Sequence, residues 1–135
     1  MFVDRLLNQG NAPLLEQMLR FTAARHRLIA ENVVNVDTPE YRQKDLSVEK
    51  FQAMLRSRVE RRRDAGDGAE VRPFDGLEAE IETPKSGLLF HDGNNRSMEQ
   101  LMADQAKNAM MHNLAVELLR KQFQAMELAL KERVS

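Results

Sequence analysis

The sequence predicts a mainly α-helical protein whose long N- and C-terminal helices pack as an antiparallel, coiled-coil-like pair. Apolar residues recur at helical spacing from Leu14 to Val33, and a heptad-like pattern runs from Ser97 to Ser135 without a glycine or proline. Alternating apolar and acidic residues from Leu77 to Thr83 indicate a small β-hairpin. We therefore expect one structural unit with three parts: an N-terminal helix and loop (1–46), a variable middle with a short helix and the hairpin (47–95), and a C-terminal heptad helix (96–135).

The composition excludes several classes of protein. The chain has 135 residues, and its net charge of −1 gives no general attraction to nucleic acid or anionic lipid. It has no cysteine, which excludes disulfides, thiolate metal sites and cysteine nucleophiles. No apolar run approaches the ~20 residues of a membrane span, and the segment from Met1 to Gln9 lacks the apolar core of a signal peptide. We expect a soluble protein that, if it leaves the cytoplasm, does so without a cleaved signal.

The N-terminal helix is predicted to begin after Asn11, a candidate N-cap, with Pro13 in its first turn. Its end is expected within 34–36, because Pro39 disfavours helical geometry at Thr38. Two adjacent apolar rows form one broad stripe on this helix: Leu14, Met18, Phe21 and Leu28, and beside them Leu15, Leu19, Ile29 and Val33.

A shorter middle helix is predicted from Ser47, whose side chain can cap its first turn. Its apolar stripe consists of Val48, Phe51, Leu55 and Val59. An arginine-rich run from Arg56 to Arg63 then leads to Gly66, where glycine favours the end of a helix. This run could bind phosphates, but no aromatic residue is interleaved with it, and a solvated helix end is the preferred interpretation.

In the predicted hairpin, the strand from Leu77 to Thr83 turns at Pro84–Gly87 and pairs with Leu88–Phe90. An isolated hairpin is marginal in water, so we expect it to dock on the helices or on a neighbour. The acidic residues of the first strand are interpreted as its solvated face, not as catalytic carboxylates: Glu78, Glu80 and Glu82.

The C-terminal helix has the spacing of a capping box at Ser97 and Gln100. With a length of roughly 50 Å at the usual rise, it is too long for a compact domain of this size, and we expect its stripe to meet the N-terminal helix first and other chains next. The stripe follows alternating steps of four and three residues: Met98, Met102, Gln105, Ala109, His112, Val116, Leu119, Phe123, Met126 and Leu130.

No residue pattern indicates catalysis or a cofactor. His26, His91 and His112 form no metal-ligand set, and His112 is interpreted as a polar residue that helps to set register in a helix seam. The segment Asp92–Asn95 is interpreted as a turn, because a calcium loop would need a glycine at Ser97 and a terminal bidentate glutamate. With no phosphate loop and no nucleophile–base pair, we expect that the protein is not an enzyme.

Two ends of the chain resemble a known family. The pattern Asn-x-x-Asn-x-x-Thr-Pro-x-Tyr lies at the end of the N-terminal helix. Three further segments lie just before or within the C-terminal helix: His91–Asn95, Met98–Glu99 and Ala106–Asn108. Together they resemble flagellar basal-body rod proteins, within the wider family of flagellar rod and hook axial proteins, and most of all a proximal rod subunit. The resemblance covers roughly residues 14–50 and 88–132.

The chain departs from that family in two places. Glu31 stands where the family usually has alanine, and Glu40 stands where glycine usually follows Thr-Pro. A Cβ atom makes positive φ costly, so Glu40 argues against a turn that needs positive φ at this position.

The resemblance implies a structural subunit that is exported without a cleaved signal through the flagellar type III apparatus. Such subunits assemble helically in the periplasm and join the membrane-embedded base to the distal rod. The implied partners are other rod subunits, further copies of the chain and the export apparatus, with no nucleic acid and no membrane span.

The alternative function is a helical-bundle adaptor or secretion chaperone without enzymatic activity. That alternative gives no reason for the Thr-Pro signature or the hairpin. The residues expected to serve assembly are Asn32, Asn35, Thr38, Pro39, Tyr41, Leu15, Leu19, Ile29, Met102, Ala109, Val116, Leu119, Phe123 and Met126.

Overall fold

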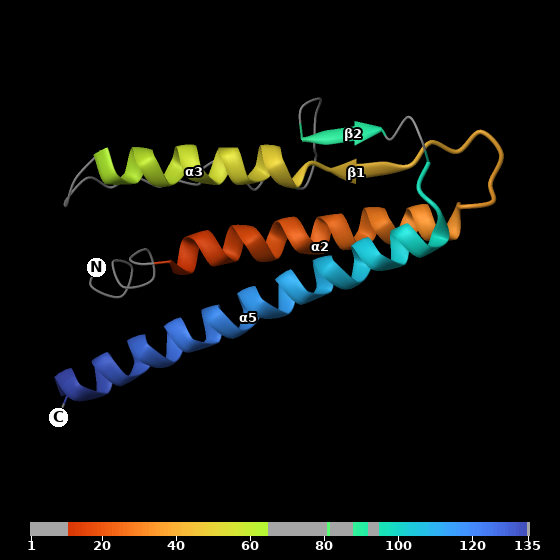
Figure 1. The fold of residues 1–135 in the computed structure, drawn as a ribbon. Helices are drawn as coiled ribbons and strands as arrows, with labels where there is room; N and C mark the ends of the chain where they lie inside the picture. The colour runs from red at the N-terminus through yellow and green to blue at the C-terminus, as the bar shows by residue number, and fades with distance from the viewer. Residues whose placement is uncertain (1–10, 65–80, 82–87, 92–94, 135) are drawn as a thin grey trace.

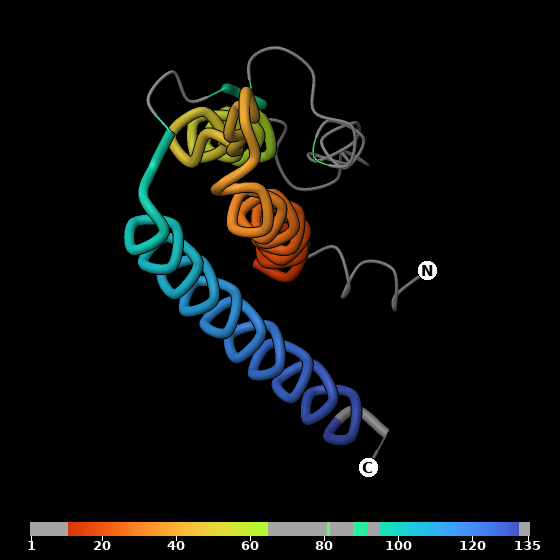
Figure 2. Tube along the Cα trace, turned by 90° about the vertical axis from the view of Figure 1, so that its right-hand side faces the viewer, coloured from red at the N-terminus to blue at the C-terminus, as the bar shows by residue number. Residues whose placement is uncertain are grey.

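The computed structural model describes residues 11–64, 81, 88–91 and 95–134. Its elements follow the order α2 (Ala12–Val34), β1 (Lys44–Leu46), α3 (Val48–Asp64), β2 (Leu89–His91) and α5 (Met98–Val134). Helix α2 lies in the middle, with α3 and the two strands on one side and α5, which runs antiparallel to α2, on the other (Figure 1). Figure 2 shows the same three layers in the perpendicular view. The predicted mainly helical fold with an antiparallel pair of long helices is confirmed.

Helix α2 begins and ends where the sequence predicts. Pro13 lies in the first turn, and Asn35 follows the last helical residue. The predicted cap is made by the backbone alone: the N–H of Leu15 donates to the carbonyl of Asn11 at 2.9 Å, while the Asn11 side chain makes no capping bond. Because proline has no N–H to donate, the first turn has one orphan donor fewer to satisfy.

The single stripe expected on α2 is in fact two faces with different partners. One row packs into a core shared with α3 and the strands: Leu14, Met18, Phe21 and Leu28. The rings of Phe21 and Phe51 stack at the centre of this core, with centroids 3.9 Å apart and planes 6° from parallel. The other face holds Leu15 and Ile29, which are buried and lie on the α5 side of α2.

Helix α3 confirms the predicted cap and stripe. The N–H of Lys50 donates to the Ser47 hydroxyl at 3.2 Å, which satisfies one orphan donor of the first turn. Phe51 and Leu55 are buried, and Val48 and Val59 pack beside them. The arginines of the last turn lie within the helix, where positive charge is stabilised by the carbonyl end of the helix dipole. Residues 65–80, including the expected helix stop at Gly66 and Gly68, lie outside the described part of the chain.

The two-stranded antiparallel sheet exists, but its strands are not those of the expected hairpin. Strand β2 agrees with the prediction, yet it pairs with β1, in the register Lys44↔His91, Asp45↔Phe90 and Leu46↔Leu89. Of the expected partner strand 77–83, only Ile81 is described, and it is helical and buried at 1% exposure in the core. At Ile81, the described position of this segment, the predicted strand is therefore wrong. The rest of that segment and the turn at 84–87 lie outside the described residues.

Helix α5 begins at the predicted capping box. The N–H of Ser97 donates to Oε1 of Gln100 at 3.1 Å, and the N–H of Gln100 donates to the Ser97 hydroxyl at 3.3 Å. Its 37 residues span about 55 Å at the usual rise per residue, against about 35 Å for the 23 residues of α2. Helix α5 therefore extends well past the described start of its partner (Figure 1).

Candidate functional site

Asn32, the first residue of the Thr-Pro-x-Tyr signature, holds the start of β1 against the end of α2. Its side chain is 2% exposed. Its Nδ2 donates to the carbonyl of Lys44 at 2.7 Å, and its Oδ1 accepts from the N–H of the same residue at 3.1 Å. The carboxamide thus satisfies both backbone groups of Lys44, as a neighbouring strand would. Because a buried backbone group without a partner is costly, Asn32 fixes where the chain returns after the loop.

Two further carboxamides tie the same loop to the start of α5. The Gln43 side chain accepts from the N–H of Arg96 at 2.8 Å and donates to its carbonyl at 2.9 Å. Asn95 completes the set, since its Oδ1 accepts from the N–H of Gln43 at 3.2 Å and its Nδ2 donates to the carbonyl of Tyr41 at 2.9 Å. The two segments of the chain that resemble rod proteins are therefore joined to each other within the chain. The sequence analysis missed Gln43 and the bonds of Asn95, because a single amide carries no periodic signal.

The loop between these clamps contains a tight turn at Thr38–Tyr41. The N–H of Tyr41 donates to the carbonyl of Thr38 at 3.3 Å, with Pro39 at the second position and Glu40 at φ 63° in the third. This is the pattern of a type II turn, whose third position favours glycine. The expectation that Glu40 argues against positive φ at this position is wrong. Glu40 adopts the left-handed conformation that the turn needs, although its Cβ atom makes this conformation strained.

Asn35 and Tyr41 connect this turn to α2. The Asn35 side chain donates to the carbonyl of Glu31 at 2.9 Å and accepts from the Thr38 hydroxyl at 3.2 Å. The Tyr41 hydroxyl donates to Oδ1 of Asn32 at 3.3 Å. Burial, with the negative charge of Glu31 as the smaller cause, raises the pKa of the Tyr41 phenol above its ordinary value and keeps it a hydrogen-bond donor. These hydrogen bonds are all internal to the chain, so these residues shape the loop.

An ion network beneath the loop links three elements. Arg25 of α2 forms a two-pronged bond with the buried Asp45 of β1, at 2.9 and 3.1 Å. Arg96, just before α5, contacts Asp45 at 3.4 Å and also pairs with Asp104 on α5. A buried carboxylate with two cationic partners is strongly directional, so the network sets how α2, β1 and α5 meet. Nothing in the spacing of these four residues could have indicated it, because the pairs are far apart in sequence.

The contact between α2 and α5 has a polar centre. Asn108 is 1% exposed and donates from Nδ2 to the carbonyl of Thr22 at 2.8 Å. The Thr22 hydroxyl lies 2.7 Å from Nδ1 of His112. The residues of α5 that are buried here follow one heptad row, Leu101, Asn108 and Ala115.

One half of the predicted α5 stripe lies one position after the buried row, and the other half lies four positions after it. The half-buried residues of the stripe are Gln105, Ala109, His112, Val116, Leu119, Met126 and Leu130. Met102 and Phe123 are 56% and 47% exposed. The predicted stripe is therefore only partly covered within the chain, and the contact of its exposed part with other chains stays a prediction. Helix α5 carries apolar residues on several sides, so its pattern could not show which adjacent row faces α2.

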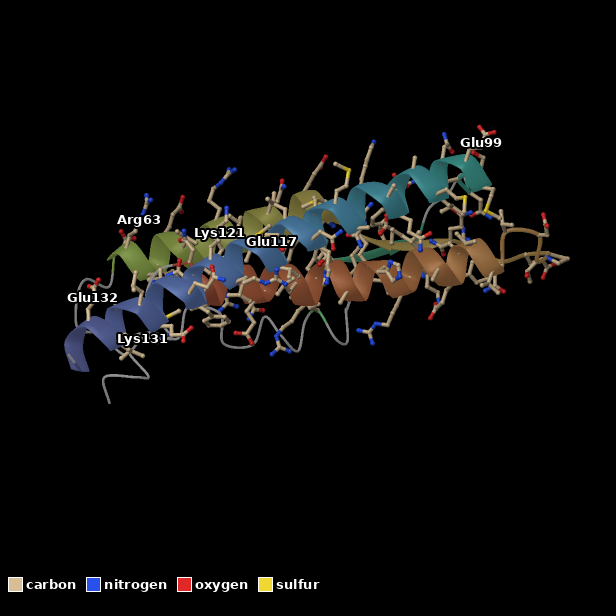
Figure 3. All side chains as sticks on the ribbon, turned by 90° about the horizontal axis from the view of Figure 1, so that it is seen from below. Arg63, Glu99, Glu117, Lys121, Lys131 and Glu132 are labelled. Carbon is tan, nitrogen blue, oxygen red and sulfur yellow. The ribbon has the colours of Figure 1, made fainter. Side chains whose placement is uncertain are left out.

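The apolar residues outside the seam leave α5 with a large uncovered surface. Among the described residues, the exposed large apolar side chains all lie on α5 except Val34: Met98, Met102, Met110, Leu114, Leu118, Phe123 and Leu128. A shallow groove beside α2 is lined by Leu19, Val116, Leu119 and Phe123, together with polar residues. The charged side chains labelled along α5 in Figure 3 are interspersed with this surface. Of these, Glu117 pairs with Arg120 within the helix, and Lys131 pairs with Glu127.

The described residues offer no other kind of site. Among them, no group of histidine, aspartate and glutamate could hold a metal ion. In the same part of the chain, no helix has both the length and the apolar character needed to cross a membrane. The apolar surface of α5 and the clamped loop are therefore the candidate functional features.

Comparison with known proteins agrees with the resemblance seen in the sequence. The chain is 26% identical over 99 residues to the flagellar basal body rod protein FlgB of Aquifex aeolicus (strain VF5), and the match covers 73% of this chain and 75% of that protein. No family model and no solved structure matches the chain. With its clamped Thr-Pro-x-Tyr loop and its open C-terminal helix, the chain is distantly similar to a flagellar basal body rod protein.

Proposed function

We propose that this chain is a structural subunit of the bacterial flagellar basal-body rod, in which its terminal helices assemble to connect the membrane-embedded base to the distal rod. The similarity to FlgB supports this proposal, together with the absence from the sequence of any pattern for catalysis. On this proposal the chain reaches the periplasm through the flagellar export apparatus without a cleaved signal, and its partners are other rod subunits and copies of itself.

The observation that carries the proposal is the uncovered apolar surface of α5. Helix α2 already packs between α5 and the α3 core, so the free sides of α5 have no cover from α2 (Figure 2). Leu114 is 58% exposed and Leu128 is 59% exposed, far along the helix. Many exposed large apolar side chains on one helix are typical of a surface that contacts another protein. Neighbouring subunits would cover it in an assembled rod.

The free apolar residues fall on two flanks of α5, which supports an open polymer. At 100° per residue, Met102 and Phe123 lie on one side of the buried row, and Leu114 and Leu118 lie on the other. Two different surfaces on one helix are suited to two different neighbours. Contacts between unlike surfaces generate rings or open helical filaments, whereas a closed dimer needs one self-complementary patch.

A helical adaptor or secretion chaperone remains the alternative function, because an open amphipathic helix could also bind a cargo helix. The clamped loop favours the rod subunit. Three carboxamides and an ion network fix the angle between α2 and the start of α5. A fixed angle is more important for a subunit of a regular polymer than for a chaperone that binds a flexible segment.

Mass spectrometry of basal bodies purified from the source bacterium tests this function. We expect the chain in stoichiometric amounts in the rod fraction and none in basal bodies from a strain that lacks its gene. A chaperone would instead remain in the cytoplasm with its cargo and be missing from the washed basal body, which would contradict the proposal.

A matched pair of substitutions tests the surface itself. Leu118→Asp places a carboxylate on one apolar flank, and Gln52→Asp places the same charge at an exposed position of α3, away from both flanks of α5. Burying an unpaired carboxylate in a protein contact costs several kcal/mol. We expect Leu118→Asp to abolish motility while export continues, and Gln52→Asp to swim normally. Equal swimming in the two strains would remove this flank from the assembly surface.

A further inference from the structure

We infer that the buried polar set formed by Thr22, Asn108 and His112 fixes the axial register of α5 against α2. This inference concerns the single chain and goes beyond its proposed role in the rod. The set lies at the centre of the helix pair, where Thr22 and Asn108 are each 1% exposed. It is therefore placed where an error in alignment would bury a polar group without a partner.

The apolar pattern of the two helices does not define their alignment. On α2, the residues seven positions before and after Thr22 are Leu15 and Ile29, both buried. On α5, those seven positions before and after Asn108 are Leu101 and Ala115, also buried. Sliding one helix by a heptad would thus place apolar residues against apolar residues again. Among the residues of the helix seam itself, only the polar set distinguishes the observed alignment from such a shifted one; the bonds of Gln43 and Arg96 act at the start of α5.

The hydrogen bonds of the set require the observed alignment. Asn108 donates to the Thr22 carbonyl at 2.8 Å, and His112 meets the Thr22 hydroxyl at 2.7 Å. The hydroxyl also lies 2.9 Å from the carbonyl of Met18. It carries one hydrogen, so when it donates to that carbonyl, Nδ1 of His112 is the donor to Thr22. After a one-heptad slip, His112 would face Leu15 or Ile29, whose side chains offer it no hydrogen bond.

The polar set also carries an energetic penalty, as polar residues that specify helix register do. Oδ1 of Asn108 is buried and has no hydrogen-bond partner among the described residues. A buried acceptor left unpaired is unfavourable, and an apolar side chain of similar size would avoid that penalty. A polar residue retained in a helix seam in spite of this penalty is the pattern by which coiled coils specify register.

The test measures the distance between spin labels on the two helices. The chain has no cysteine, so Arg27→Cys on α2 and Gln124→Cys on α5, both at exposed positions, give two unique labels. The labels are far apart along the helix axis, and a slip of seven residues would change their separation by about 10 Å. We expect one narrow distance in the otherwise unaltered chain. Adding Asn108→Leu should produce a second population shifted by about 10 Å.

Gln122→Leu is the matched control, because Gln122 lies on the same heptad row as Asn108 and is half-buried. It should leave one distance. A single unshifted distance in Asn108→Leu, or a second distance in both variants, would overturn the inference. Thr22→Val, which replaces the hydroxyl with a methyl group, is an independent test if Asn108→Leu does not fold. It should also broaden the distribution of distances between the two labels. An unchanged narrow distribution would contradict the role of the polar set.

Discussion

The two sides of α2 differ in how they are packed. On the α3 side, the stacked rings of Phe21 and Phe51 are almost fully buried among aliphatic residues. On the α5 side, the centre is polar, with Asn108 bonded to Thr22, and the apolar residues at the edge are half-exposed. The first side closes a core within the chain. The second side gives α5 a defined position and leaves many of its large apolar side chains exposed.

This difference predicts where stability resides. Phe51→Ala removes half of the ring stack and leaves a cavity, and we expect a loss of about 3–5 kcal/mol in the free energy of unfolding. Leu118→Ala on the exposed flank of α5 should change it by less than about 0.5 kcal/mol. Urea unfolding followed by circular dichroism measures both. Similar losses would show that the two sides do not differ as described.

The next largest effect is expected in the clamped loop. Asn32→Ala removes a side chain that pairs with both backbone groups of Lys44 and with the Tyr41 hydroxyl, and should cost about 2–3 kcal/mol. Asn35→Ala removes exposed bonds and should cost about 0.5 kcal/mol. Should the two substitutions have equal effects in the same unfolding experiment, the clamp would not be what holds β1.

The tight turn offers a gain in stability. Glu40 has φ 63°, a conformation that glycine adopts without the strain of a Cβ. Glu40→Gly should therefore raise the free energy of unfolding by about 1 kcal/mol, while Glu31→Gly, inside α2, should lower it by about the same amount. Thermal unfolding measures whether each substitution raises or lowers the stability. A loss of stability in Glu40→Gly would contradict the strained turn.

The last effect concerns the Tyr41 hydroxyl and depends on pH. Tyr41→Phe should cost about 1 kcal/mol at neutral pH, because one neutral hydrogen bond to Asn32 is lost. Since the pKa of the folded phenol is raised, its contribution is complete below the ordinary pKa of about 10 and is lost as the pH rises through the folded value. The difference between the two proteins should therefore shrink above that pH. A stability difference between the two proteins that grows above this pH would contradict the raised pKa of Tyr41.

Local features of this fold could be predicted from the sequence. Pro13 and Pro39 bracket α2, and the pairing of Ser97 with Gln100 marks the start of α5, because each acts on backbone groups within a few residues. The resemblance to rod proteins was visible for the same reason, since its signature residues are close together in sequence.

Long-range features could not be predicted. Strand β1 is only three residues long and shows no alternation, so its pairing with β2 has no sequence signal. The bonds from Arg25 to Asp45 and from Asn108 to Thr22 join distant parts of the chain. The most buried row of α5, Leu101, Asn108 and Ala115, was also missed, because a helix with apolar residues on several sides permits more than one seam.

Hydrogen exchange of the isolated chain and of assembled basal bodies tests the central claim most directly. The claim is that α2 is stabilised within the subunit, whereas the second half of α5 is completed by neighbours. In the dilute chain, amides around Phe21 should exchange slowly and amides from Phe123 to Leu130 should exchange rapidly; in the assembled rod both should be protected. Equal and slow exchange of the two segments in the dilute chain, unchanged on assembly, would contradict it.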